Sequence, residues 1–125
     1  MSRIIHIAVK VDDLDKTNRF YEEVFGFTPM GSSRSADRSL SRRSLSDGAI
    51  NLTLLKYDSE DAPNAQAAGQ GPCIHHFGIE VDDVEECLAE VRKHGCEMLG
   101  NSATKFRVPG GPIAEIKPKG SYQKR

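Results

Sequence analysis

The sequence HHFGIEVDD, residues 75–83, follows the same pattern as IHIAVKVDD, residues 5–13. Apolar and polar residues alternate in both stretches, which is typical of a half-buried β-strand. Both stretches end in two aspartates, which favour the start of a helix because their side chains accept hydrogen bonds from its free N–H groups. The repeat therefore predicts an internal duplication in which each copy begins with a strand and a helix.

Both copies continue in the same order. An apolar helical stripe from Leu14 to Val24 ends at Gly26, and the matching stripe over 84–91 ends at Gly95. The turn expected in the first copy lies at Asp47–Gly48. After the helices, strands are expected at two places within 28–48, at 49–57, near 96–100, near 104–108 and at 113–118.

This order describes two βαβββ modules in one domain spanning residues 1–125, the first module over about 1–57 and the second over about 73–118. Residues 58–72 are polar, contain Pro and Gly and lack periodicity, so we expect them to form a linker. The predicted fold class is α+β, with curved mixed sheets around a cavity.

The composition argues against several classes of function. Seventeen basic and eighteen acidic residues nearly balance, whereas binding to nucleic acid or to an anionic membrane favours a basic excess. No apolar run approaches the roughly 20 residues of a membrane span, and the N-terminus lacks a signal-peptide pattern. Three cysteines without CxxC spacing indicate reduced thiols, so we expect a cytoplasmic protein.

Strand alternation sorts the side chains of the two opening strands into faces. The equivalent polar faces carry His6, Ala8 and Lys10 in the first copy and His76, Gly78 and Glu80 in the second. The small second residue of each set leaves space beside a histidine ring. His75 falls on the opposite face with Phe77, so we expect it to be a packed or hydrogen-bonded structural histidine.

The last strand of each copy extends the comparison. Aligning AINL with IAEI pairs Asn51 with Glu115. If these polar residues line the concave side of the sheets with His6 and His76, two imidazoles and a carboxylate converge on one cavity. That set suits a divalent transition metal, and it matches the 2-His-1-carboxylate triad of non-heme iron enzymes. The alternative is a cavity lined by ordinary polar residues.

The stretches HIAVKVDDLDKTNRFYEEVFGF (6–27) and HHFGIEVDDVEECLAEVRKHG (75–95) resemble the vicinal oxygen chelate superfamily, which includes glyoxalase I, methylmalonyl-CoA epimerase, extradiol dioxygenases and bleomycin-binding proteins. The resemblance implies about eight strands in two curved sheets closing on a cavity, and commonly a homodimer. It implies a divalent ion (Ni, Co, Zn, Mn or Fe) held by His6, His76 and Glu115. Asn51 would be a fourth or water-mediated ligand.

The resemblance implies a metal-dependent glyoxalase-like lyase or isomerase acting on a small oxygenated substrate, with an enediolate-type intermediate and Glu115 as the catalytic residue. Lys10 is a candidate for binding a substrate carboxylate, or else a surface lysine. Glu80 is a candidate for a second functional carboxylate in the cavity, or else a solvated one at its rim. The alternatives are an extradiol-type dioxygenase and a metal-free binding protein of the bleomycin-resistance kind.

Two questions stay open in the sequence. The serine-rich stretch 28–48 contains Arg34, Arg38, Arg42 and Arg43, which either bind an anionic substrate or form an exposed polar edge that discourages strand pairing. The resemblance also leaves open whether His6 and His76 meet within one chain or across a dimer interface.

Overall fold

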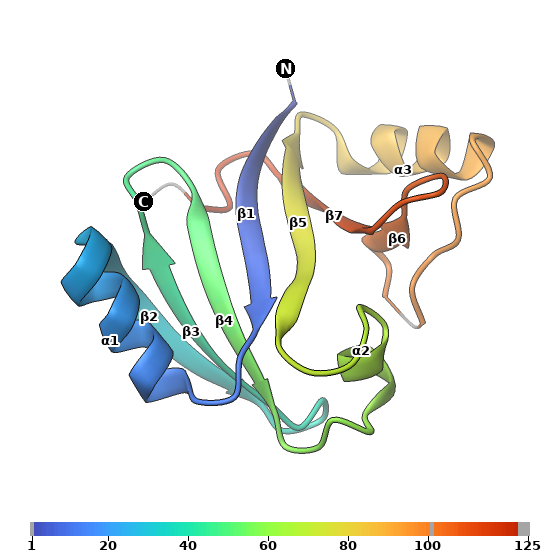
Figure 1. The fold of residues 1–125 in the computed structure, drawn as a ribbon. Helices are drawn as coiled ribbons and strands as arrows, with labels where there is room; N and C mark the ends of the chain where they lie inside the picture. The colour runs from blue at the N-terminus through green and yellow to red at the C-terminus, as the bar shows by residue number, and fades with distance from the viewer. Residues whose placement is uncertain (1, 101, 123–125) are drawn as a thin grey trace.

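The fold is a single curved mixed sheet with three helices, seen in Figure 1 in a computed structural model that describes residues 2–100 and 102–122. The strand order is β2-β3-β4-β1-β5-β7-β6. The elements are β1 (Arg3–Lys10), α1 (Leu14–Phe25), β2 (Thr28–Ser35), β3 (Leu40–Ser46), β4 (Asn51–Tyr57), α2 (Pro63–Gln66), β5 (Cys73–Val81), α3 (Val84–Lys93), β6 (Lys105–Arg107) and β7 (Ile113–Pro118).

The two predicted modules are present and share this one sheet. β1 pairs in parallel with β4, and β5 pairs in parallel with β7 in the same way. The antiparallel pairing of β1 with β5 joins the modules at the centre of the sheet, where the two strands stand side by side in Figure 1. The predicted fold class is therefore confirmed, although the two expected sheets are continuous.

The strand expected near 96–100 does not form in the described part of the chain. A single bridge from Met98 to Phe106 is all that extends the sheet beyond β6. Gly95 just before this segment and Gly100 at its end adopt positive φ angles of 76° and 52°, which are incompatible with extended backbone. The sheet consequently has seven strands where eight were expected.

The helix signals in the sequence act as predicted, through the second aspartate of each pair. Asp13 accepts a hydrogen bond from the backbone N–H of Lys16, and Asp83 accepts one from Glu86. Gly26 ends α1 in the left-handed conformation, with φ 71°. α1 contacts β3 and β4 while α3 contacts β7, so each helix packs on its own module. Within the described residues, no helix is long and apolar enough to cross a membrane.

A bulge in β5 overturns the expected orientation of His75. Ala8 pairs with His76 and Val9 pairs with Ile74, which leaves His75 as an extra residue without a partner in the ladder. An extra residue breaks strict alternation. His75 is therefore buried beside His76 instead of sharing the face of Phe77, while Ile74 is 66 % exposed. The same register shift occurs at Ile5 in β1, the equivalent place in the first copy.

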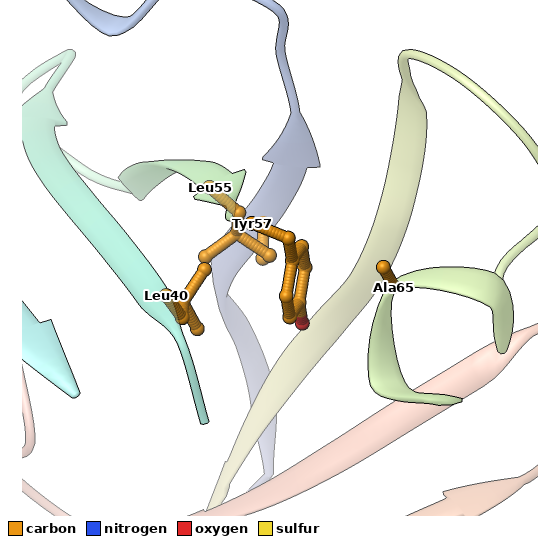
Figure 2. Packing of buried hydrophobic residues seen from close by; sticks show 5 residues of the cluster. Leu40, Leu55, Tyr57 and Ala65 are labelled. Atoms are coloured by element: carbon orange, nitrogen blue, oxygen red, sulfur yellow. The ribbon is translucent and has the colours of Figure 1, made fainter. Parts of the chain in front are cut away.

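The linker is more ordered than its composition predicts. Its short helix α2 packs on the first module, where Ala65 joins a buried cluster with Leu40, Leu55 and Tyr57, shown in Figure 2, and with Ala8. A second buried cluster joins α3 to β5, β6 and β7 and includes Val81, Leu88, Phe106, Ala114 and Ile116. The linker thus closes one end of the concave side.

Lys10 holds the linker against the sheet. Its side chain is 2 % exposed, and its ammonium donates hydrogen bonds to the carbonyls of Ala65 (2.6 Å) and Gly69 (2.7 Å) and to Glu60 Oε1 (3.2 Å). An ammonium has three N–H donors, so all of them are engaged. Lys10 therefore has a structural role here, and its predicted substrate-binding role stays a prediction.

Replacing Lys10 with methionine tests this role. The variant keeps the apolar stem and removes the donors, so the buried carbonyl of Ala65 is left unsatisfied, and we expect the free energy of unfolding to fall by about 1–3 kcal/mol. Lys93→Met is the matched control, because Lys93 is an exposed residue paired with Glu90 on the surface of α3. Chemical denaturation measures both variants, and equal stability of the two would contradict the assignment.

Candidate metal centre

Three strands bring His6, His76 and Glu115 together. The closest set of their ligand atoms lies within 4.8 Å of one another. The Nε2 atoms of His6 and His76 lie 4.0 Å and 3.3 Å from Glu115 Oε1. All three residues belong to one chain, on β1, β5 and β7, so the set assembles without a second copy.

Gly78 makes room for the His6 ring. It lies opposite His6 in the β1–β5 ladder, and a Cβ added to it would meet His6 Cβ at 3.0 Å and Cδ2 at 3.1 Å. Those distances are shorter than normal carbon contacts. The space that the sequence predicted beside a histidine ring is therefore used across the strand pair, by the ring of the other copy.

Asn51 sets the tautomer of His6. Its Oδ1 accepts hydrogen bonds from His6 Nδ1 at 2.8 Å and from Thr53 Oγ1 at 2.7 Å. An amide oxygen is an acceptor, so the proton of His6 resides on Nδ1 and the Nε2 lone pair faces Glu115. The oxygen of Asn51 already accepts two hydrogen bonds, so its predicted role as a fourth or water-mediated ligand remains a prediction.

A chain of two hydrogen bonds through His75 sets the tautomer of His76. The backbone carbonyl of Asn64 lies 2.7 Å from His75 Nε2, and His75 Nδ1 lies 2.7 Å from His76 Nδ1. The carbonyl can only accept, so His75 donates from Nε2 and its Nδ1 accepts the proton of His76. His76 Nε2 is then left to face Glu115, which matches the arrangement at His6.

Burial and nearby charges set the protonation states of His6, His75 and Glu115. Burial lowers the pKa of His6 and of His75 to about 4, so both rings are neutral near pH 7. Burial raises the pKa of Glu115, but the neighbouring His76 ring and the charges of Lys105 and Lys117 outweigh it, and the pKa falls to about 2. The carboxylate is therefore ionised at neutral pH.

The sheet register corrects the alignment of Asn51 with Glu115. Gly78 pairs with Glu115 in the second module, and its equivalent Ala8 pairs with Thr53 in the first. Thr53, two residues beyond Asn51, is thus the counterpart of Glu115. A threonine hydroxyl stands where a duplicated carboxylate would be, and the candidate ligand set is two imidazoles and one carboxylate.

The set opens onto a cavity of about 350 Å³ on the concave side of the sheet. Its lining is rich in cations, and Glu115 is the one carboxylate among the described residues that line it: Arg38, Arg42, Lys105 and Lys117 stand with His6, His76, Ser33, Ser44, Thr53 and Tyr122, beside Ala8 and Leu55. Lys117 could have been anticipated, since it shares the face of Glu115 by alternation. Lys105 and Tyr122 carry no such signal.

Glu80 anchors the C-terminal segment and is not among the residues that line this cavity. Its Oε2 accepts a hydrogen bond from the backbone N–H of Gly120 at 3.0 Å, and Oε1 lies 3.6 Å from Arg3 Nε. Two residues later, the ring of Tyr122 stacks on His6 with centroids 5.0 Å apart. Glu80 thus supports the segment that covers His6, and its predicted role in the cavity stays a prediction.

The four arginines of the serine-rich stretch divide into two pairs. Arg34 forms two hydrogen bonds with Asp58, at 3.0 and 2.6 Å, and Arg43 pairs with Asp15 of α1. Arg38 and Arg42, by contrast, line the cavity. The structure thus separates the two pairs by position, and the binding of an anionic substrate stays a prediction for Arg38 and Arg42 alone.

Known proteins resemble this chain in sequence and in fold. A sequence profile of the Glyoxalase/Bleomycin resistance protein/Dioxygenase superfamily matches residues 3–105. The mitochondrial methylmalonyl-CoA epimerase of Mus musculus is 27 % identical over 125 residues, which cover 95 % of this chain and 67 % of the relative.

Solved structures agree with the sequence match. A variant of the Streptomyces coelicolor methylmalonyl-CoA epimerase, in complex with 2-nitronate-propionyl-CoA, is 25 % identical, with a TM-score of 0.74 over 95 % of this chain and 98 % of that one. A hypothetical protein of Bacillus halodurans C-125 has the same fold, with a TM-score of 0.80 over 94 % of each chain at 23 % identity. The chain thus belongs to the Glyoxalase/Bleomycin resistance protein/Dioxygenase superfamily.

Proposed function

We propose that the chain is a metal-dependent isomerase or lyase that acts on a small oxygenated substrate, with one divalent ion held by His6, His76 and Glu115. The observation that carries the proposal is the arrangement of two imidazoles, each with Nε2 directed at the same carboxylate, on the wall of a 350 Å³ cavity. Imidazole and carboxylate ligands suit nickel, cobalt, zinc, manganese and iron.

The two oxygens of Glu115 have different neighbours. Oε1 faces His6 and His76, whereas Oε2 lies 3.7 Å from Lys105 Nζ and 3.9 Å from Lys117 Nζ. A bound ion would act as a Lewis acid that holds two neighbouring substrate oxygens and stabilises negative charge on them. In this proposal Oε1 would hold the ion, and Oε2 would accept the proton that leaves the substrate carbon and return it to the product. The adjacent ammonium groups of Lys105 and Lys117 would stabilise the charge that develops meanwhile. Tyr122 limits the access of water above His6.

The second candidate is an extradiol-type dioxygenase. Thr53 at the register position that corresponds to Glu115 leaves three strong ligands, which is the 2-His-1-carboxylate set of non-heme iron oxygenases with open coordination positions. The third candidate, a metal-free binding protein, does not need the convergence of these three residues.

The native chain is expected to bind one divalent ion, measured by metal analysis after purification without chelator and by calorimetric titration with Zn²⁺ or Co²⁺. His76→Ala and Glu115→Gln each remove a ligand, and we expect affinity to fall by at least about 100-fold. His94→Ala is the control, because His94 is an exposed residue at the end of α3. Unchanged affinity in both ligand variants, or no binding by the native chain, would overturn the metal site.

The reaction class is separated by two measurements on metal-loaded protein. In the first, the protein is incubated in D₂O with methylmalonyl-CoA, the substrate named in the relatives. If the chain is an isomerase, the native protein exchanges the C2 hydrogen of this substrate with solvent faster than the His76→Ala variant does. Oxygen uptake on catechols by the iron-loaded chain favours the dioxygenase instead. Stoichiometric ligand binding without exchange or oxygen uptake favours the binding protein.

The relay through His75 predicts a specific pattern of metal affinity. His75→Ile places in the second copy the residue found at the equivalent bulge of the first, and it removes the acceptor for His76 Nδ1, so we expect metal affinity to fall about 10- to 100-fold. His75→Gln supplies an amide oxygen as a new acceptor and is expected to recover most of that loss.

Nitrogen-15 NMR spectra of the histidine rings test the same relay independently of affinity. At mildly alkaline pH, His6 and His76 are expected to carry the proton on Nδ1 and His75 on Nε2. The opposite tautomer at His76 would show that His75 does not position it.

A homodimer remains part of the proposal. Ile4 and Ile74 on the two central strands are 54 % and 66 % exposed, and Phe20, Val24 and Phe25 of α1 are also exposed. Phe20 and Phe25 contact each other with ring centroids 5.7 Å apart, and an exposed apolar cluster of this kind commonly marks an interface. Light scattering from the native chain tests the expected doubled mass. The cytoplasmic location and the absence of nucleic-acid binding stay predictions.

A further inference from the structure

We propose that the cavity selects a small dianion: one end chelates the ion with two neighbouring oxygens, and a second anionic group, a carboxylate or a phosphonate, binds Arg42, Arg38 and Lys105. The chelating end rests on the proposed function. The second anionic site stands on the charges of the cavity and is testable without the ion.

The charge of the cavity opposes the charge of the chain. The chain carries a formal net charge of −1, yet four of the described residues lining the cavity are cations and one is a carboxylate. Like charges within a few ångströms of one another repel, more strongly where water is partly excluded. An anionic ligand relieves this repulsion.

The distribution of arginine partners separates this cluster from an ordinary polar surface. Arg34 and Arg43 lie outside the cavity and pair with Asp58 and Asp15. Among the residues that the structure describes, Arg38 and Arg42 form no ion pair. Neighbours in sequence, Arg42 and Arg43, therefore have opposite electrostatic environments, and only the arginine that faces the cavity lacks a carboxylate.

Arg42 is held in position with donors to spare. Its Nη1 donates to Ser35 Oγ at 2.8 Å, with Ser33 Oγ at 3.5 Å, and this fixes one end of the guanidinium. A guanidinium has five N–H donors in a planar fork that matches an oxyanion. In the described chain, its Nη2 and Nε have no hydrogen-bond partner. The preorganised fork therefore offers two parallel N–H groups to a carboxylate or phosphonate.

The available space restricts the ligand to a small molecule. The main cavity holds about 350 Å³, near the lower limit for small-molecule sites. A narrower hollow of about 40 Å³ continues behind Arg38, Arg42 and Lys105, and Leu40, Leu55 and Leu99 line part of it. Both anionic groups must therefore lie on one short skeleton, with room for a small apolar substituent beyond the cations.

Two matched ligands test the proposal. 2-Oxoglutarate and 2-oxopentanoate share the 2-oxoacid end and differ by one carboxylate, and 2-oxo-4-phosphonobutyrate carries the phosphonate alternative. Calorimetry on Co²⁺-loaded native protein is expected to give dianion affinity about 10- to 100-fold above that of 2-oxopentanoate. Arg42→Gln or Arg38→Gln reduces this preference to about threefold or less. Arg43→Gln, the matched control, retains it, and the tighter dianion identifies the preferred second group.

Metal titration of the same variants separates the two proposals. Unchanged Co²⁺ affinity in Arg42→Gln, with loss of the dianion preference, supports the second anionic site. If the metal proposal fails, the same ligand pair is measured on metal-free protein, where the preference still depends on Arg42. Equal affinity of the native protein for dianions and monoanion, or a preference that survives in both Arg42→Gln and Arg38→Gln, overturns the inference.

Discussion

The antiparallel pairing of β1 with β5 is the constraint on which the rest of the structure depends. It joins two modules that would otherwise each expose an open sheet edge, which is an unfavourable arrangement for isolated sheets. It also sets His6 against Gly78, so that the ring from one copy occupies the space left by the other. Because β4 and β7 flank the pair, Asn51 reaches His6 from one side and Glu115 approaches both rings from the other.

The two copies support their histidines by different means. In the first, the side-chain amide oxygen of Asn51 accepts a hydrogen bond from His6 Nδ1. In the second, His75 at the bulge accepts one from His76 Nδ1 and donates one from its own Nε2 to a backbone carbonyl of the linker. Second-layer hydrogen bonds of this kind orient ligands and tune their basicity. The linker, anchored by Lys10, thereby belongs to the architecture of the site although its sequence is polar and aperiodic.

Local patterns were sufficient to predict the duplication and the helix caps, because each depends on periodicity or on residues a few positions apart. The set of His6, His76 and Glu115 needed the family resemblance as well, because strand pairing over long sequence separations brings these residues together. The environment of His75 could not be predicted in this way, since a bulge changes the face of a strand without altering its composition. Thr53 was missed for a related reason. The register between parallel strands depends on tertiary pairing, and the alignment of short apolar segments paired Glu115 with Asn51, two residues before Thr53. Tyr122 reaches His6 through a C-terminal turn that no periodicity describes.

The two copies contribute different residues to the cavity. The second copy contributes the carboxylate, the histidine relay and the two lysines near Glu115. The first contributes Thr53 at the matching position and the two arginines that line the cavity, Arg38 and Arg42. A second carboxylate at Thr53 would cancel one positive charge where an anionic ligand has to approach. The hydroxyl leaves that charge in place and, through Asn51, helps to orient His6. The two copies thus share the proposed metal ligands, through His6 on β1 and His76 and Glu115 on β5 and β7, and differ in the charged groups that they place around the cavity.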